Sequence, residues 1–266
     1  METSEVGPAG VLPLPLVVSE ETRRSYESAS PWRHIVVDRL LDPELVLAAE
    51  REELAPALEL KVRRTARLAK AESAEPSGPA AKSIMRSWSS PEFISYLESL
   101  TGIEDLTPDP THDARGLHVF PSGGFQAVHR DFRLQPVTRM FHRLTVLLYL
   151  NSDWSAEFGG ELELWDAHAR SCVRSIEPVA GRMVILEPGP HAIHGIPDPV
   201  RCPPDRARLS LICSYFTTTP APDDRREPRV LRPKRPQDPW HLRFMPVRDA
   251  TTEFRHRVRR WFERSS

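Results

Sequence analysis

The residues of this sequence that could do chemistry together begin with His129 and Asp131, one residue apart in the stretch GLHVFPSGGFQAVHRDF. In an extended strand, residues i and i+2 point to the same face, so the imidazole and the carboxylate would lie side by side while Arg130 points away. Two histidines and one carboxylate form the facial triad that binds non-haem Fe(II). This spacing supplies two of the three ligands, and a second histidine must come from another strand.

Two histidines in the stretch PGPHAIHGIPDP are candidates for the third ligand. His194 lies on the far side of the turn that follows the apolar run GRMVILEP, whereas His191 lies within the turn itself. We therefore favour His194 and expect His191 to be a loop residue near the mouth of the site. The predicted catalytic metal site is His129, Asp131 and His194.

Arg208 is the candidate anchor for an anion, because it opens the apolar run RLSLICSYF. Strand alternation places Arg208 and Ser210 on one face. An arginine at the start of a buried strand needs an anionic partner, and a guanidinium binds a carboxylate through two parallel hydrogen bonds. That partner is either a carboxylate of the protein or a small dicarboxylate co-substrate. Arg206 is a rival for the same role.

The elements that position these residues are expected to be strands from about residue 116 onward. Apolar or alternating runs are separated by glycine and proline, which is typical of a sandwich or barrel. The runs are RLTVLLYLN, ELELW, CVRSIEP, GRMVILEP and RLSLICSYF. Upstream, WRHIVVDRLL alternates like a strand, and two helices are expected after the capping residues Asp42 and Ser90. Between them, residues 61–83 are expected to form a helix end and a mobile loop.

The composition is that of a soluble globular protein, with 39% hydrophobic residues, 27% charged residues and a net charge of -1. Such a charge gives no general attraction to nucleic acid or acidic membranes, so no nucleic-acid partner is expected. No apolar run approaches the roughly 18 residues that a membrane span requires. The odd number of widely spaced cysteines (Cys172, Cys202 and Cys213) indicates reduced thiols and a cytoplasmic location.

The order of these motifs resembles the Fe(II)/2-oxoglutarate-dependent oxygenases, specifically their prolyl 4-hydroxylase-like branch. The resemblance rests on GLHVFPSGGFQAVHRDF, RLTVLLYLNSDW, FGGELELWD, GRMVILEPGPHAIHG and RARLSLICSYF. It implies a mainly β fold with supporting helices, in which a double-stranded β-helix (a cupin-like jelly roll) carries N-terminal helices on one sheet. It also implies Fe(II) at His129, Asp131 and His194, and the distal carboxylate of 2-oxoglutarate at Arg208. O2 would be the oxidant, and ascorbate an optional further cofactor.

On this basis the chain divides into four parts. These are a flexible lead-in (1–30), an N-terminal helical support region (31–112), the Fe(II)/2-oxoglutarate β-helix core (113–220) and a C-terminal extension (221–266). The extension is rich in Pro and Arg, carries 13 Arg or Lys against 7 Asp or Glu, and ends in a predicted amphipathic helix. That helix would dock on the core or form a homodimer; the alternative is a basic surface for an acidic partner or nucleic acid.

Two positions depart from the family pattern, in which tyrosines on two strands hydrogen-bond 2-oxoglutarate. The positions that we match to them are Phe120 and Leu148, neither of which can donate a hydrogen bond. Ser210 would compensate. The carboxylate of Asp131 favours hydroxylation over halogenation, because a small residue there would leave room for a halide.

The resemblance implies hydroxylation of an unactivated C–H with succinate and CO2 as co-products, on a prolyl residue, an amino acid or a small metabolite. The loops 132–142 and 153–158 would select the substrate, and Arg133, Arg139 and His142 would suit an anionic one or form a solvated basic loop. Two alternatives are a cupin-like metal-binding module without turnover and an interaction protein that acts through its basic tail.

Overall fold

The computed structural model describes residues 11–13, 16–112 and 114–221. Its helices are α1 (Glu20–Glu27), α2 (Pro43–Glu59), α3 (Pro79–Ser87) and α4 (Pro91–Thr101). The strands of its first half are β1 (His34–Asp38), β2 (Arg63–Arg64), β3 (Leu68–Ser73), β4 (Thr107–Pro108), β5 (Arg115–Pro121) and β6 (Phe125–Arg130). Those of its second half are β7 (Phe141–Tyr149), β8 (Leu162–Trp165), β9 (Cys172–Ile176), β10 (Arg182–Leu186), β11 (Ile193–Ile196) and β12 (Ala207–Thr217).

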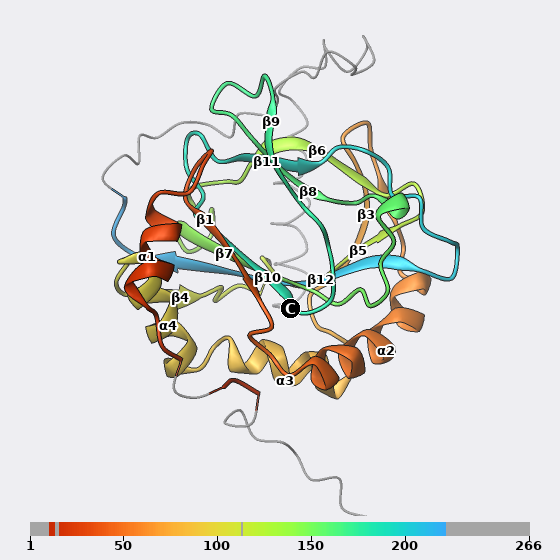
Figure 1. Cartoon of the computed structure of the whole chain (residues 1–266), viewed down its shortest axis with the longest axis horizontal. Coiled ribbons are helices and arrows are strands. Elements are labelled where there is room, and N and C mark those ends of the chain that lie inside the picture. The colour runs from red at the N-terminus through yellow and green to blue at the C-terminus, as the bar shows by residue number, and fades with distance from the viewer. Residues whose placement is uncertain (1–10, 14–15, 113, 222–266) are drawn as a thin grey trace, which may run out of the picture.

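The strands form two antiparallel layers joined through β3. Their hydrogen-bonded order is β1-β10-β7-β12-β5-β3-β6-β11-β8-β9, with β2 on β3 and β4 on β12. The major sheet runs from β1 to β3, and the minor sheet from β6 to β9; β3 pairs with β5 through Ala71–Ser73 and with β6 through Leu68 and Ala69. Figure 1 shows β6, β11, β8 and β9 on one side of the major sheet and α2, α3 and α4 on the other. The predicted jelly-roll core with helices on one sheet is confirmed.

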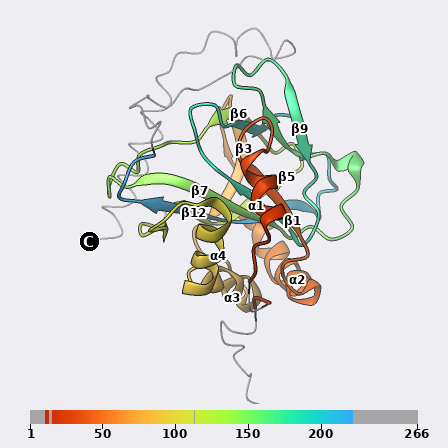
Figure 2. The ribbon, with the colours of Figure 1, turned by 60° about the vertical axis from the view of Figure 1, so that its left-hand side comes forward.

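The two faces of the major sheet bury different residues, as the period-2 geometry of strands requires. On β7, Leu144, Val146 and Leu148 belong to the cluster that includes Trp88 and Phe93 of the helical layer. Leu147 and Tyr149 of the same strand face the minor sheet, and they cluster with residues of β8 in that sheet and of the neighbouring strand β10. Figure 2 shows α2, α3 and α4 together beyond the outer face of this sheet. The helices therefore support the sheet from outside and leave its inner face to line the space between the layers.

Both predicted helix starts are confirmed by their caps. The Asp42 carboxylate accepts the backbone N–H of Glu44 (2.9 Å) at the start of α2. The Ser90 hydroxyl accepts that of Phe93 (3.3 Å) at the start of α4. Gly102 ends α4 with a φ of 70°, a left-handed conformation that glycine adopts without steric cost.

Two expectations for the N-terminal part differ from the structure. Residues 1–30, expected to be a flexible lead-in, include α1, whose Tyr26 is fully buried and donates a hydrogen bond to Glu187 (2.6 Å). The mobile loop expected within 61–83 is wrong, because this range contains β2, β3 and the start of α3. The region 31–112 therefore contributes strands to the core as well as supporting helices.

The predicted C-terminal extension, its amphipathic helix and the dimer interface assigned to it lie outside the described residues, apart from Ala221. None of the helices in the described ranges combines the length and the hydropathy needed to cross a bilayer.

Candidate active site

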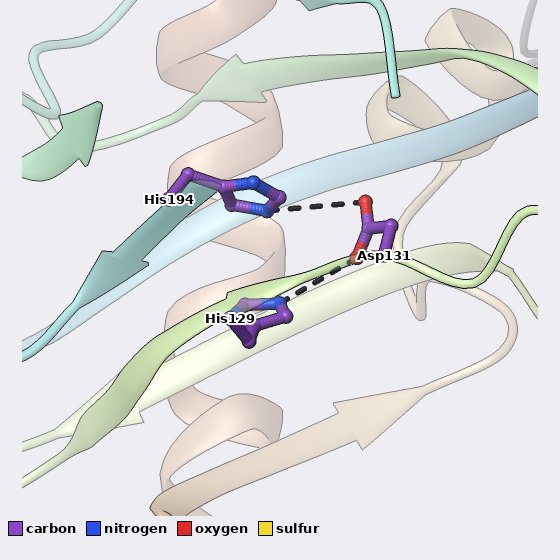
Figure 3. Close-up of side chains that lie close together, drawn as sticks. All are labelled: His129, Asp131 and His194. Atoms are coloured by element: carbon purple, nitrogen blue, oxygen red, sulfur yellow. Dashed lines mark ion pairs between the residues drawn. The ribbon is translucent and has the colours of Figure 1, made fainter. Parts of the chain in front are cut away.

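The structure brings the three predicted metal ligands together between the two sheets. His129 on β6 and His194 on β11 are cross-strand partners, and Asp131 follows the end of β6. The Asp131 carboxylate lies 3.5 Å from Nε2 of His129 and 3.8 Å from Nε2 of His194 (Figure 3). One potential ligand atom from each residue lies within 4.8 Å of the others. His191, the alternative ligand, is exposed in the turn before β11 and lies outside this cluster.

Backbone carbonyls fix the ring orientation of both histidines. Nδ1 of His129 lies 3.0 Å from the carbonyl oxygen of Ala127, and Nδ1 of His194 lies 3.3 Å from that of Ala192. A carbonyl only accepts, so each Nδ1 carries the proton and each Nε2 presents a lone pair toward the carboxylate. The side-chain amide of Gln126 donates to Nε2 of His129 (3.0 Å), as this tautomer requires. Two imidazoles and a carboxylate thus converge on one point.

The protonation states agree with that tautomer. Burial opposes the ionisation of Asp131, but His194 and His129 outweigh it and hold the pKa of this carboxyl well below its usual range. Burial lowers the pKa of His194 to about 4, despite the opposing effect of Asp131. At neutral pH, His194 is therefore neutral and Asp131 is ionised, which are the forms that bind a metal.

Arg208 enters the same cavity from β12, with only 2% of its surface exposed. Its Nε donates to the carbonyl of Gly160 (2.6 Å). The guanidinium carbon lies 5.1 Å from the ring centre of Phe120 on β5 and 4.8 Å from that of Tyr149 on β7. Because Nε is already bonded and an aromatic ring lies on each side, the terminal N–H groups are the ones left for a ligand.

No carboxylate of the described residues forms an ion pair with Arg208. Within that part of the chain, the anionic partner expected for Arg208 is therefore not a carboxylate of the protein. The rival Arg206 instead lies 3.7 Å from the carboxylate of Glu50 and donates to the carbonyl of Ser152, outside the cavity. Burial lowers the pKa of Arg208, because a charged guanidinium is less stable away from water. A bound anion would offset this cost.

Two buried hydroxyl groups accompany Arg208. Ser210 and Tyr149 are cross-strand partners on β12 and β7, and neither hydroxyl has a hydrogen-bond partner among the described residues. Leu148, the position matched to a family tyrosine, does not face the cavity. Leu148 faces the helices, whereas Tyr149 faces inward beside the guanidinium. Phe120 does face the cavity and offers no hydrogen-bond donor there.

The cavity that holds these groups has a volume of about 110 Å³, and sequence reasoning missed part of its polar lining. These residues are Lys70 and Glu72 on β3, His118 on β5 and Gln126 on β6. None of them carried a usable signal: strand alternation would place Gln126, three residues before His129, on the opposite face, and the register of β6 with β11 shifts between these two residues. The two β3 residues lie in a segment that the sequence analysis assigned to a loop.

The loop 132–142 contributes differently than expected. His142 lines the cavity but is 2% exposed, with its ring 5.1 Å from those of both Phe132 and Phe216. Its Nδ1 lies 3.1 Å from the Phe132 carbonyl oxygen, and the Thr145 hydroxyl lies 3.0 Å from its Nε2. His142 is therefore a satisfied residue of the cavity wall rather than a free cation.

Comparison with known proteins agrees with this geometry. The family model of the 2OG-Fe(II) oxygenase superfamily matches residues 116–215. No curated protein sequence matches the chain.

Solved structures resemble the chain at the level of the fold. A prolyl-4-hydroxylase from Pseudomonas putida has 22% identity and a TM-score of 0.51, over 74% of this chain and 96% of the other. A Trichoplax adhaerens prolyl hydroxylase, solved with a peptide fragment of the hypoxia inducible factor oxygen degradation domain, has 15% identity and a TM-score of 0.51, covering 73% and 87%. HygX from Streptomyces hygroscopicus, solved with nickel and 2-oxoglutarate, has 11% identity and a TM-score of 0.51, covering 76% and 88%.

The matched segment contains every residue of the His-Asp-His cluster together with Arg208, and the surrounding fold is the one that prolyl hydroxylases share. Fe(II) and 2-oxoglutarate are the cofactors of this class, and a cluster of two histidines and a carboxylate is the donor set for such an iron. Residues 116–215 therefore match the 2OG-Fe(II) oxygenase superfamily, and the fold around them is similar to that of prolyl hydroxylases.

Proposed function

We propose that this 2-oxoglutarate-dependent dioxygenase hydroxylates an unactivated C–H group, with succinate and CO2 as co-products. His129, Asp131 and His194 would hold Fe(II), while Arg208 and Ser210 would hold the distal carboxylate of 2-oxoglutarate. The observation that carries the proposal is a single cavity that joins the His-Asp-His cluster to a buried arginine without an ion pair among the described residues.

The cluster fits an iron ion by its chemistry. Both Nε2 atoms are unprotonated, and the carboxylate stays ionised in spite of its burial. Three ligands on one side of a metal leave the opposite side open to other molecules. The amide of Gln126 must give up its bond to Nε2 of His129 when a metal binds, which would leave a hydrogen-bond donor beside the open side.

The Arg208 end of the cavity fits a carboxylate. The guanidinium supplies a bidentate donor, and the unpartnered hydroxyl groups of Tyr149 and Ser210 lie on the neighbouring positions of the sheet. A buried polar group without a partner is costly, so two such hydroxyl groups beside the buried guanidinium support a ligand that satisfies them together.

The protein residues position and protect the reactants, while bound iron and 2-oxoglutarate supply the oxidising chemistry with O2. The Asp131 carboxylate would neutralise part of the charge of a bound metal. Leu147, Leu162 and Leu186 form an apolar wall of the cavity, which excludes water from the reacting groups.

The substrate would be a prolyl residue, an amino acid or a small metabolite. The Trichoplax enzyme was solved with a peptide fragment, which supports testing peptidyl proline first. The three free cysteines support a cytoplasmic location, where thiols stay reduced.

The proposal is tested by titrating the Fe(II)-loaded protein with 2-oxoglutarate under anaerobic conditions and following the visible metal-to-ligand charge-transfer band. We expect the band in wild type and a much higher requirement for 2-oxoglutarate in Arg208→Ala. Arg206→Ala is the matched control, because this arginine lies two residues away and outside the cavity; its titration should match wild type. A protein that binds iron but shows no band would instead be a metal-binding module without turnover.

A further inference from the structure

A second cation, Lys70 on β3, lies near the Phe120 ring, and β5, which carries Phe120, lies between β3 and β12 in the sheet. Arg208 is the cross-strand partner of Phe120, and the β3–β5 register, in which Ala71 faces Val119, brings Lys70 opposite Phe120 on the inner face. The Lys70 ammonium lies 6.0 Å from the centre of the Phe120 ring, and the Arg208 guanidinium carbon lies 5.1 Å from it. Both residues line the same cavity. One aromatic ring without a donor is thus flanked by two buried cations.

The hydrogen-bonding capacity of Lys70 is only partly used. Lys70 is 5% exposed, and its ammonium has three N–H donors. Within the described ranges its one ion-pair partner is Glu72, at 2.7 Å. That leaves two donors of a buried cation for a ligand, and buried donors without acceptors are costly.

Glu72 does not depend on Lys70 alone. Its carboxylate also lies 3.4 Å from Nε2 of His118 and 3.9 Å from the Arg63 guanidinium. The Glu72 carboxylate is therefore shared among three basic side chains and is not reserved for Lys70.

We propose that Lys70 is a second carboxylate-binding residue of the cavity, which holds the distal carboxylate of the co-substrate over the Phe120 ring together with Arg208. The inference rests on the proposed function, because it takes the carboxylate to be the one bound at Arg208. A carboxylate can accept about four hydrogen bonds, so a bidentate guanidinium on one edge leaves lone pairs for an ammonium. Lys70 would thus supply, from β3, the donor that Phe120 cannot.

The test compares two 2-oxo acids that differ only at the distal end. The first is 2-oxoglutarate, and the second is 2-oxovalerate, which carries a methyl group in place of the distal carboxylate. Their Kd values are measured from the charge-transfer band of the anaerobic Fe(II) protein in wild type, Lys70→Met, Lys70→Gln and Lys70→Arg. Lys82→Met is the matched control, since Lys82 is exposed on α3. Thermal unfolding without ligand checks that each variant is folded.

We expect Lys70→Met and Lys70→Gln to raise the Kd of 2-oxoglutarate by about tenfold or more, because a hydrogen bond between charged groups is lost. The Kd of 2-oxovalerate should not change, Lys70→Arg should restore most of the affinity, and Lys82→Met should match wild type. An unchanged Kd for 2-oxoglutarate in both neutral variants would overturn the inference. So would an equal loss for both acids, which would place Lys70 at the chelating end or in a purely structural role.

The failure of this inference differs from that of the proposed function. If wild type forms the band and Arg208→Ala loses its preference for 2-oxoglutarate over 2-oxovalerate, the anchor is established. Unaltered binding by the Lys70 variants would then overturn the role of Lys70 alone. Absence of the band in iron-loaded wild type would overturn both.

Discussion

Single residues of the site depend on hydrogen bonds that no sequence motif contains. Both ligand histidines donate Nδ1–H to the carbonyl oxygen two residues earlier in their own strand, at Ala127 and Ala192. The HxD spacing predicts which side chains share a face, but it does not predict which nitrogen faces the metal. The backbone carbonyl beside each Nδ1 fixes the ring orientation, so both Nε2 atoms point toward the metal site without a bound metal.

We predict that Asp131→Asn weakens metal binding much more than a change next to the site. The substitution keeps the shape of the side chain but removes the charge that stabilises a divalent ion. Loss of an outer-shell partner typically costs about 10–100-fold in metal affinity, and loss of a charged ligand should cost at least as much. Titration with Co(II), followed by visible absorbance, measures the Kd. His191→Ala is the control, and an equal loss in that variant would contradict the assignment of His194 as the third ligand.

We predict that Gly160→Ala damages the co-substrate site, whereas Gly181→Ala does not. Both glycines have left-handed backbones, with φ of 81° and 76°, so both substitutions should destabilise the fold by about 1–2 kcal/mol. A Cβ at residue 160 would lie 3.0 Å from Cδ of Arg208, while one at residue 181 would meet nothing within 4 Å. The 2-oxoglutarate Kd should therefore rise in Gly160→Ala alone. Equal Kd values in the two variants would mean that the Gly160 turn does not position Arg208.

The sequence predicts the orientation of single side chains correctly where the two-residue alternation of a strand is applied, and incorrectly where it is not. Alternation correctly places Arg208 and Ser210 inside and Leu209 outside. The same alternation along β7 places Leu148 outside and Tyr149 inside, so it would have corrected the match to the family tyrosine. A one-residue slip on a strand moves a side chain to the opposite face.

At the scale of elements, the strands of the core could be predicted because they are apolar and rich in β-branched residues. β3 could not, because LAKAES consists largely of Ala, Lys and Glu, which are depleted in strands and favoured in helices. Its extended form depends on pairing with β5 and β6. Such long-range pairing is invisible in a local sequence window, so the second cation of the cavity was also missed.

The position of each strand in the sheets predicts its local stability. β12 lies between β5 and β7, and almost all of its residues are buried, whereas β9 pairs with β8 at the end of the strand order and four of its five residues are exposed. We expect the amides of β12 to exchange with solvent most slowly and those of β9 much faster, since edge strands open without unfolding the core. Hydrogen exchange followed by mass spectrometry measures this order. Similar protection of the two strands would argue that β9 is covered by another part of the protein.

At the scale of the whole molecule, one cavity gathers the candidate metal ligands and anion-binding side chains of the described residues. These residues lie between Lys70 and Ser210, and the last strand of the described part ends at Thr217. The chemistry proposed above uses no residue after Ala221. The basic composition of residues 222–266 supports a separate role, such as contact with an acidic partner.

We therefore predict that deletion of residues 222–266 leaves the anaerobic 2-oxoglutarate titration unchanged within about twofold, since an effect of less than about 0.5 kcal/mol is typical of changes away from a site. Thermal unfolding of the shortened protein serves as the folding control. If the band persists while binding to a partner is lost, the tail and the oxygenase core act separately. If the shortened protein folds but no longer binds 2-oxoglutarate, residues beyond Ala221 complete the site, and the cavity formed by the described residues is only part of it.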